Sequence, residues 1–166
     1  MARPAQQRKD GRRYGGWIIA GACAAVVAGI GYAYVMALSG GGGAGANDPE
    51  QVALGREVYT KACASCHGAN LEGQPDWKMR QANGRLPAPP HNDTGHTWHH
   101  PDQILFEMTK LGIEALAPEG YESDMPGFAD TLSDEQIRAV IAYIKSTWPA
   151  QIRARQESIS RQYDGN

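Results

Sequence analysis

One short motif constrains this chain more than any other feature, and it reads Cys63-Ala64-Ser65-Cys66-His67. Two thiols at this spacing can each add to a vinyl group of a haem, and the histidine that follows then faces the iron as an axial ligand. A redox dithiol, a disulfide and half of a zinc site are the alternatives. A zinc site needs a second pair of ligands, and the third cysteine, Cys23, lies in an apolar stretch. The motif therefore predicts one covalent haem c attached to Cys63 and Cys66, with His67 as an iron ligand.

The N-terminal part of the chain falls into three segments of different composition. Residues 1–13 carry five basic side chains against one acid, and residues 17–38 contain no charged side chain. An apolar run of about 20 residues can cross a membrane as a helix, and a basic flank keeps the N-terminus in the cytoplasm. We therefore expect residues 14–38 to be an uncleaved transmembrane anchor, with a cleaved signal peptide as the alternative. Residues 39–47 read as a flexible glycine-rich linker.

Helical spacing of apolar residues predicts an all-α domain after this linker. Asp48 followed by Pro49 is typical of a helix start, and Ser133 is typical of a helix cap. The residues between 68 and 101 are rich in Gly, Pro, Asn and Asp and show no period, which indicates a long loop wrapped around something. The expected helices are Pro49 to about Ala62, Pro101-Asp102 to Leu111, Ser133 to just before Pro149, and a polar, surface-lying extension at residues 149–161.

A second iron ligand is expected far along the chain, and three methionines are candidates for it. Met79 lies between two basic residues in the long loop, and Met108 lies on the apolar face of an expected helix, where packing is its more natural role. Met125 lies in an extended turn just before the last core helix. Since a loop can direct a sulfur inward, Met125 is our preferred axial ligand, and methionine raises the reduction potential relative to a second histidine.

Together these residues resemble class I c-type cytochromes over residues 48–148. Gly55 and Tyr59 look like the family's first-helix pair, which packs against the last helix, here residues 140–144. The run Met125-Pro126-Gly127-Phe128 and the run Leu132-Ser133-Asp134-Glu135 are similar to the family's methionine loop and to the start of its final helix.

The resemblance implies a cytochrome c fold of three to five helices around one covalent haem, with residues 149–166 as a C-terminal extension. It also implies that a backbone carbonyl of Pro89 or Pro90 accepts the free N–H of His67. The expected function is electron transfer without a substrate, so the protein should be an electron carrier and not an enzyme. A subunit of a larger oxidoreductase complex is the alternative.

A histidine-rich segment departs from the family pattern. Four of the five histidines in the chain lie within ten residues, at positions His91, His96, His99 and His100. Imidazoles at this density can bind copper or zinc, so a haem- or copper-handling protein is a further hypothesis.

The simpler interpretation of this segment is that its side chains surround the haem. Trp98 and His99, with Arg85 from the preceding loop, would then hydrogen-bond the haem propionates, which would otherwise be buried charges.

The charge of the chain bears on its partners. After residue 13 the chain has 17 acidic residues against 11 basic ones, which can attract a basic patch on a partner and argues against nucleic acid. We expect membrane redox complexes or periplasmic electron-transfer proteins as partners, and the lipid bilayer around residues 14–38. The haem domain would lie on the periplasmic side of a bacterial inner membrane.

Overall fold

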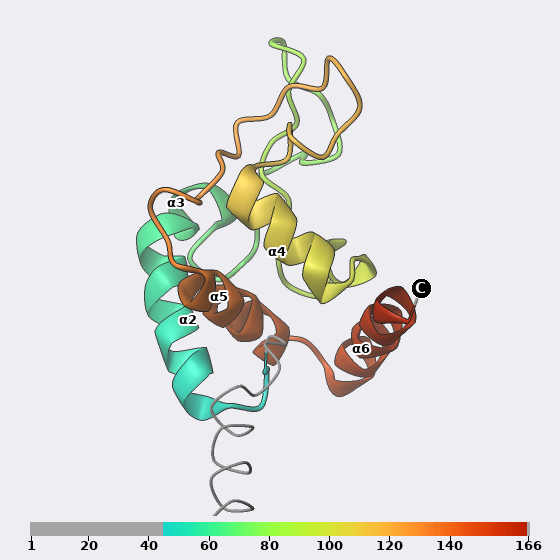
Figure 1. Cartoon of the computed structure of the whole chain (residues 1–166). Helices are drawn as coiled ribbons and strands as arrows, with labels where there is room; N and C mark the ends of the chain where they lie inside the picture. Colours follow the sequence, from blue (N-terminus) through green and yellow to red (C-terminus); the bar gives the residue numbers. More distant parts are fainter. Residues whose placement is uncertain (1–44, 166) are drawn as a thin grey trace, which may run out of the picture. The chain divides into compact units, whose positions relative to one another are not determined.

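The structure is a computed structural model, and it describes residues 45–165 (Figure 1). Between these residues the chain forms five α-helices and one 3-10 helix and no β-strand, which confirms the all-α class for this part. The anchor predicted at residues 14–38, the basic residues 1–13 and residues 39–44 lie outside the described residues. In the described range, no helix combines the length and the apolar character needed to span a bilayer.

The long helices occupy the positions that local signals predict. The Asp48 side chain caps the first one by accepting hydrogen bonds from the amides of Glu50 and Gln51 at 3.0 and 3.3 Å. Ser133 and Gln136 form a reciprocal capping box at the start of another. In chain order the helices are α2 (Pro49–Ala62), α3 (Ala64–His67), η1 (Thr97–His99), α4 (Asp102–Leu111), α5 (Asp134–Ser146) and α6 (Ala150–Asp164).

Helices α2 and α5 pack directly against each other (Figure 1). They approach most closely at Gly55, where an added Cβ would overlap the carbonyl oxygen of Ala139 and lie 2.8 Å from the Cβ of Tyr143. The ring of Tyr59 lies one turn further along, with its centroid 5.5 Å from that of Tyr143. The predicted pairing of the first and last core helices is therefore confirmed.

Two clusters of buried apolar side chains lie on either side of α5. One joins α5 to α2 and to the loop after His67, and the other joins α5 to α4. Burial of a single large apolar side chain contributes about 1.5–3 kcal/mol, so these clusters hold the helices together. The first cluster contains Val58, Tyr59, Leu71, Val140, Ile144 and Trp148, and the second contains Leu105, Ile137, Ile141 and Ala142.

Helix α6 differs from its prediction as a surface-lying extension, because part of its polar face is buried. Gln156 is fully buried, and its amide nitrogen donates to Asp102 Oδ1 at 2.7 Å and to the His100 carbonyl at 3.1 Å. The ammonium of Lys145 on α5 lies within 2.8 Å of both oxygens of the same Asp102 carboxylate. The amide nitrogen of Gln156 and the ammonium of Lys145 are thus both paired, whereas Gln156 Oε1 is buried without a partner in the described chain. These bonds tie α6 to α4 and α5.

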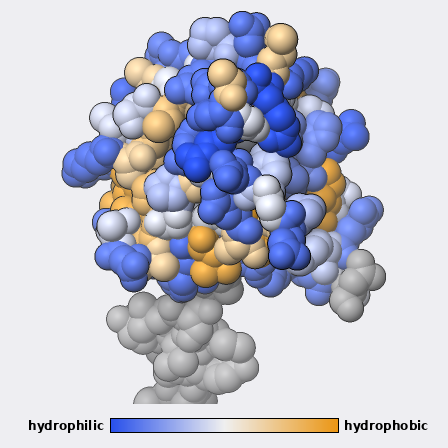
Figure 2. Space-filling view, turned by 90° about the horizontal axis from the view of Figure 1, so that it is seen from above, coloured by the Kyte–Doolittle hydropathy of each residue, from blue (hydrophilic) through white to orange (hydrophobic). Residues whose placement is uncertain are grey.

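Two long loops, residues 68–96 and 112–133, connect these helices, and parts of both extend on one side of them (Figure 1). Seen from that side, the surface is mainly hydrophilic, with hydrophobic residues near its edge (Figure 2).

Candidate functional site

The cysteine motif lies where α2 ends. Cys63 is the last capping residue of α2, and α3 continues at once, so that the amides of Cys66 and His67 both bond to the Cys63 carbonyl, at 3.1 and 2.9 Å. Both thiols are free, with Cys63 half-buried and Cys66 exposed. Burial, and to a smaller extent the neighbouring Cys66, raises the pKa of Cys63 to about 11. One helical turn thus presents two unpaired thiols and an imidazole.

The imidazole of His67 is buried and held by the loop that follows it. Its Nδ1 lies 2.8 Å from the carbonyl oxygen of Pro89, and since only a protonated nitrogen can donate to a carbonyl, Nδ1 carries the proton. Burial lowers the pKa of His67, and the bond to Pro89 offsets this in part. The neutral ring therefore keeps the lone pair of Nε2, the form that binds a metal.

The two prolines that were candidates for this contact have different surroundings. Pro89 supplies the carbonyl, whereas Pro90 is buried between two glycines. A Cβ on Gly73 or on Gly95 would overlap the Pro90 backbone, so the loop can close this tightly only with glycine at both positions.

Tyr59 on α2 stabilises the end of α3, a role that its position in the sequence did not indicate. Its hydroxyl donates to the Gly68 carbonyl at 2.9 Å and lies 3.3 Å from the His67 carbonyl. Burial raises the pKa of this phenol well above its ordinary value. The hydroxyl therefore remains a donor to the end of α3.

His91 lies beside His67, although it is far from it in the sequence. The two rings are stacked, with centroids 3.9 Å apart and planes 23° apart. His91 Nδ1 is 2.8 Å from the Thr97 hydroxyl, and its carbonyl accepts a 2.7 Å bond from the indole of Trp148. Burial, followed by the proximity of His67 and His96, lowers the pKa of His91 well below its ordinary value.

The other three histidines of the segment contact tryptophans or one another, and the rings of His96 and His100 lie edge to face with centroids 5.4 Å apart. His96 stacks on Trp77 at 5.6 Å between centroids, and His99 packs on Trp98 at 3.7 Å. The pKa values of His96 and His100 are lowered, mainly by burial. Within residues 45–165, no group of three or more His, Cys, Asp or Glu side chains is placed to hold a metal ion. The hypothesis of a second metal therefore finds no such site in this part of the chain.

Trp98 carries an orphaned donor. Its indole nitrogen is buried and has no hydrogen-bond partner in the described chain, and the guanidinium of Arg155 lies 5.3 Å from its ring centroid. An unpaired buried N–H costs about 1–3 kcal/mol, and an acceptor on a bound group would offset this cost. A haem carboxylate is such an acceptor. Free thiols, a neutral imidazole with an open nitrogen and this donor together fit a covalently attached haem.

The methionines are placed differently from one another. Met79 is 67% exposed in the first loop, whereas Met108 is half-buried on α4. Met125 is half-buried in the second loop, where its amide bonds to the Ser123 hydroxyl at 3.1 Å. It lines a cavity of about 290 Å³.

Arg85 contacts the second loop, where Glu122 Oε2 lies 3.4 Å from its Nε and Asp124 pairs with its Nη1. The bonds to Asp124 and then to Glu122 raise the pKa of Arg85. These partners follow Arg85 by 37 and 39 residues, so no local pattern indicated them.

Comparisons with known proteins agree with this site. The cytochrome c family model matches residues 52–148. A cbb3-type cytochrome c oxidase subunit FixP of Sinorhizobium medicae is 29% identical over 96 residues, which are 57% of this chain and 29% of that subunit. The chain therefore spans less than a third of the length of this relative, and no solved structure gives a significant match. Since the family model covers more than half of the chain and includes the two thiols and the imidazole that fit haem c, the protein belongs to the cytochrome c family.

Proposed function

We propose that the protein transfers single electrons as a membrane-anchored c-type cytochrome, with His67 and Met125 as the axial ligands of one haem iron. Haem c, when bound, supplies an iron that accepts and releases one electron. The observation that carries the proposal is the 2.8 Å contact between His67 Nδ1 and the Pro89 carbonyl, because it leaves Nε2 free for the iron. In this proposal Cys63 and Cys66 hold the haem by thioether bonds.

The other predicted neighbours of the haem have separate roles in this proposal. Trp98 donates its indole N–H to a propionate, with His99 packed on its ring, and Pro89 fixes the His67 ring. Pro90 and its flanking glycines keep the loop close to the imidazole. Because these side chains are already held by packing, the site can change oxidation state with little rearrangement of the protein.

The methionine assignment is tested by the visible spectrum of the haem-loaded protein. Methionine bound to ferric haem gives a weak charge-transfer band in the red, and Met125→Ala is expected to abolish it. Met79→Ala is the matched control, since its side chain is 67% exposed, and it should leave the band unchanged. Loss of the band in Met108→Ala and not in Met125→Ala would transfer the assignment to Met108.

The location of the domain is the second part of the proposal. The uncharged residues 17–38 behind a basic segment support an anchor that leaves the haem domain on the periplasmic side. Carbonate-washed membranes from a bacterium that expresses the full chain should retain the haem protein, whereas a chain in which a cleavable signal peptide replaces residues 1–38 should be released. Release of the full chain by the wash would contradict an anchor.

The partners are proposed to be membrane redox complexes that present a basic patch. Seven acidic residues and no basic ones lie between residues 114 and 135, and all seven are exposed. Opposite charges accelerate association and lose this effect at high salt. The electron-transfer rate with a membrane fraction should therefore fall as the ionic strength rises.

A second candidate function is a subunit of an oxidase complex, which the name of the Sinorhizobium medicae relative favours. Native electrophoresis of mildly solubilised membranes, stained for haem, separates the two functions. A carrier migrates alone, whereas a subunit migrates with a large complex that has cytochrome c oxidase activity.

A further inference from the structure

Arg85 connects the two long loops of the protein. Its guanidinium pairs with Asp124, and its Nε lies 3.4 Å from Glu122 Oε2. Figure 1 shows the two loops side by side on this side of the helices. Asp124 immediately precedes Met125, so one arginine of the first loop reaches the residue next to the proposed iron ligand in the second.

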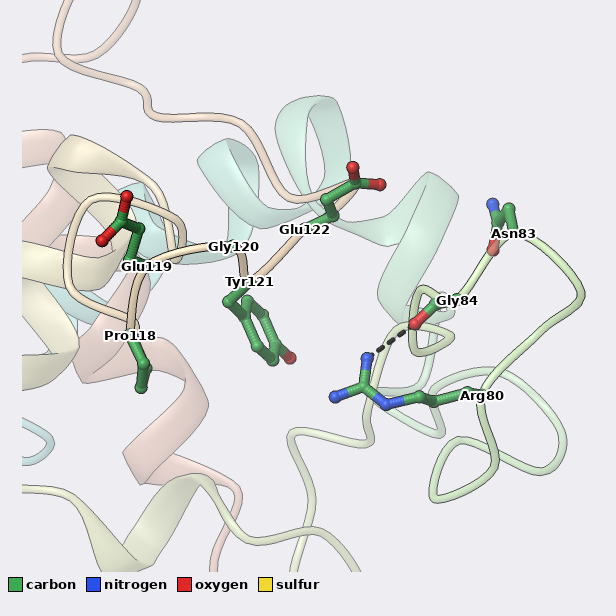
Figure 3. Close-up of a pocket in the computed structure, with 8 residues that line it drawn as sticks. All are labelled: Arg80, Asn83, Gly84, Pro118, Glu119, Gly120, Tyr121 and Glu122. Atoms are coloured by element: carbon green, nitrogen blue, oxygen red, sulfur yellow. Dashed lines mark hydrogen bonds between the residues drawn. The ribbon is translucent and has the colours of Figure 1, made fainter.

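The turn that carries Arg85 is itself well ordered by hydrogen bonds. The amide of Arg85 bonds to the Asn83 side chain at 3.0 Å, and its carbonyl accepts the Gln81 amide at 2.9 Å. Arg80 adds a 2.6 Å bond to the Gly84 carbonyl and points its guanidinium toward the Tyr121 ring, 5.5 Å from the centroid (Figure 3). A cavity of about 470 Å³ lies between these loops. The turn therefore presents Arg85 from a defined position.

The segment before Met125 depends on this contact. The amides of Ser123 and Met125 bond only within their own loop, to Glu114 Oε1 at 2.8 Å and to the Ser123 hydroxyl at 3.1 Å. In the described chain, the polar bonds of residues 119–125 to segments outside residues 112–133 all go to Arg85. The Arg85 side chain is 34% exposed, and the side chains of Asp124 and Glu122 are 59% and 65% exposed, so water and salt screen both pairs and each contributes modestly.

We propose that Arg85 is a positioning residue for Met125, which it holds toward the iron by fixing Asp124 and Glu122. The proposal rests on the proposed function, because it takes Met125 as the ligand. Arg85 also lies four residues before Pro89, the acceptor for His67 Nδ1. The same arginine therefore links the segments that support both axial ligands, and its loss should free the methionine loop without altering the imidazole.

Added imidazole reports this effect, because it binds the ferric iron only when the methionine has left. Imidazole is titrated into the holoprotein of the full chain, both as wild type and as the variants Arg85→Gln, Asp124→Asn, Arg85→Lys and Lys61→Gln. Arg85→Gln and Asp124→Asn should bind imidazole about threefold to tenfold more tightly than wild type, the range that follows from losing one or two partly exposed ion pairs. Arg85→Lys keeps the charge and should restore part of the wild-type affinity. Lys61→Gln removes an exposed ion pair on α2 and should have no effect.

The outcomes separate this inference from the proposed function. A wild-type ferric spectrum without the methionine band contradicts Met125 ligation, and the role of Arg85 falls with it. A wild-type band that Met125→Ala abolishes, together with unchanged imidazole affinity in Arg85→Gln and Asp124→Asn, overturns the role of Arg85 alone. If Arg85→Gln does not fold, Asp124→Asn decides, because it removes the same ion pair by changing an exposed side chain.

Discussion

Gly55 on α2 lies directly against the carbonyl of Ala139 on α5, with no space for a side chain between them. Gly55→Ala should therefore force the helices apart and lower the free energy of unfolding by roughly 1–3 kcal/mol, in spite of the better helix propensity of alanine. Chemical denaturation of the holoprotein measures this. Arg56→Ala, at the next and exposed position, should change stability by less than about 0.5 kcal/mol. Equal stability of the two variants would contradict the close crossing.

Trp98→Phe tests whether the orphaned indole finds an acceptor when haem is bound. If a propionate accepts its N–H, the variant should lose about 1–3 kcal/mol of holoprotein stability. Trp148→Phe is the comparison with a known bond, because that indole donates to the His91 carbonyl at 2.7 Å. Trp77→Phe removes the same atoms from another half-buried ring and corrects for ring size. A Trp98 variant no less stable than the Trp77 variant would mean that the donor remains unpaired.

Tyr59→Phe removes the hydroxyl that supports the end of α3. The Gly68 carbonyl, 2.9 Å from this hydroxyl, then loses its partner in a partly buried position, and a cost of about 1–2 kcal/mol is expected. Tyr143→Phe is a matched control on the neighbouring ring and should be nearly neutral. Thermal unfolding followed at the haem absorption measures both. A neutral Tyr59→Phe would show that the turn is held without this bond.

Lys145→Met leaves the Asp102 carboxylate without its buried cation. Because the Lys145 side chain is only 4% exposed and that of Asp102 25%, we expect a loss of roughly 3 kcal/mol, the usual consequence of breaking such a pair from one side. Adding Asp102→Asn should recover part of this loss, since the unpaired charge is then absent. Lys61→Met, in an exposed pair with Glu57, should cost less than about 1 kcal/mol. A double variant less stable than Lys145→Met would contradict the assignment of the cost to the unpaired carboxylate.

The helix starts could be predicted from the sequence because their signals are local. Asp48 and Ser133 each cap amides no more than three residues away. The cysteine motif is equally local, since one turn of backbone carries all of its chemistry. What could not be predicted depends on distant partners. Arg85 finds its acids 37 and 39 residues later.

Adjacency in the sequence did not decide how the histidine-rich segment is arranged. A shared metal site was one hypothesis for its four imidazoles, but His91 stacks on His67 whereas His96 stacks on Trp77 and contacts His100. The burial of Gln156 could not be predicted either. A polar residue on a helix is expected to be exposed, and the groups that pair with this one, the His100 carbonyl and Asp102, are distant in the sequence.

The packing of α2 against α5 also bears on how the core forms during synthesis. Helix α2 ends at Ala62, and α5 begins only at Asp134, so a chain that grows from its N-terminus carries the cysteine motif long before the helix that completes its core. Long-range pairs of this kind form late, since a large loop must close first. The thiols of Cys63 and Cys66 are therefore present in the growing chain before α5 exists to close the core beside them.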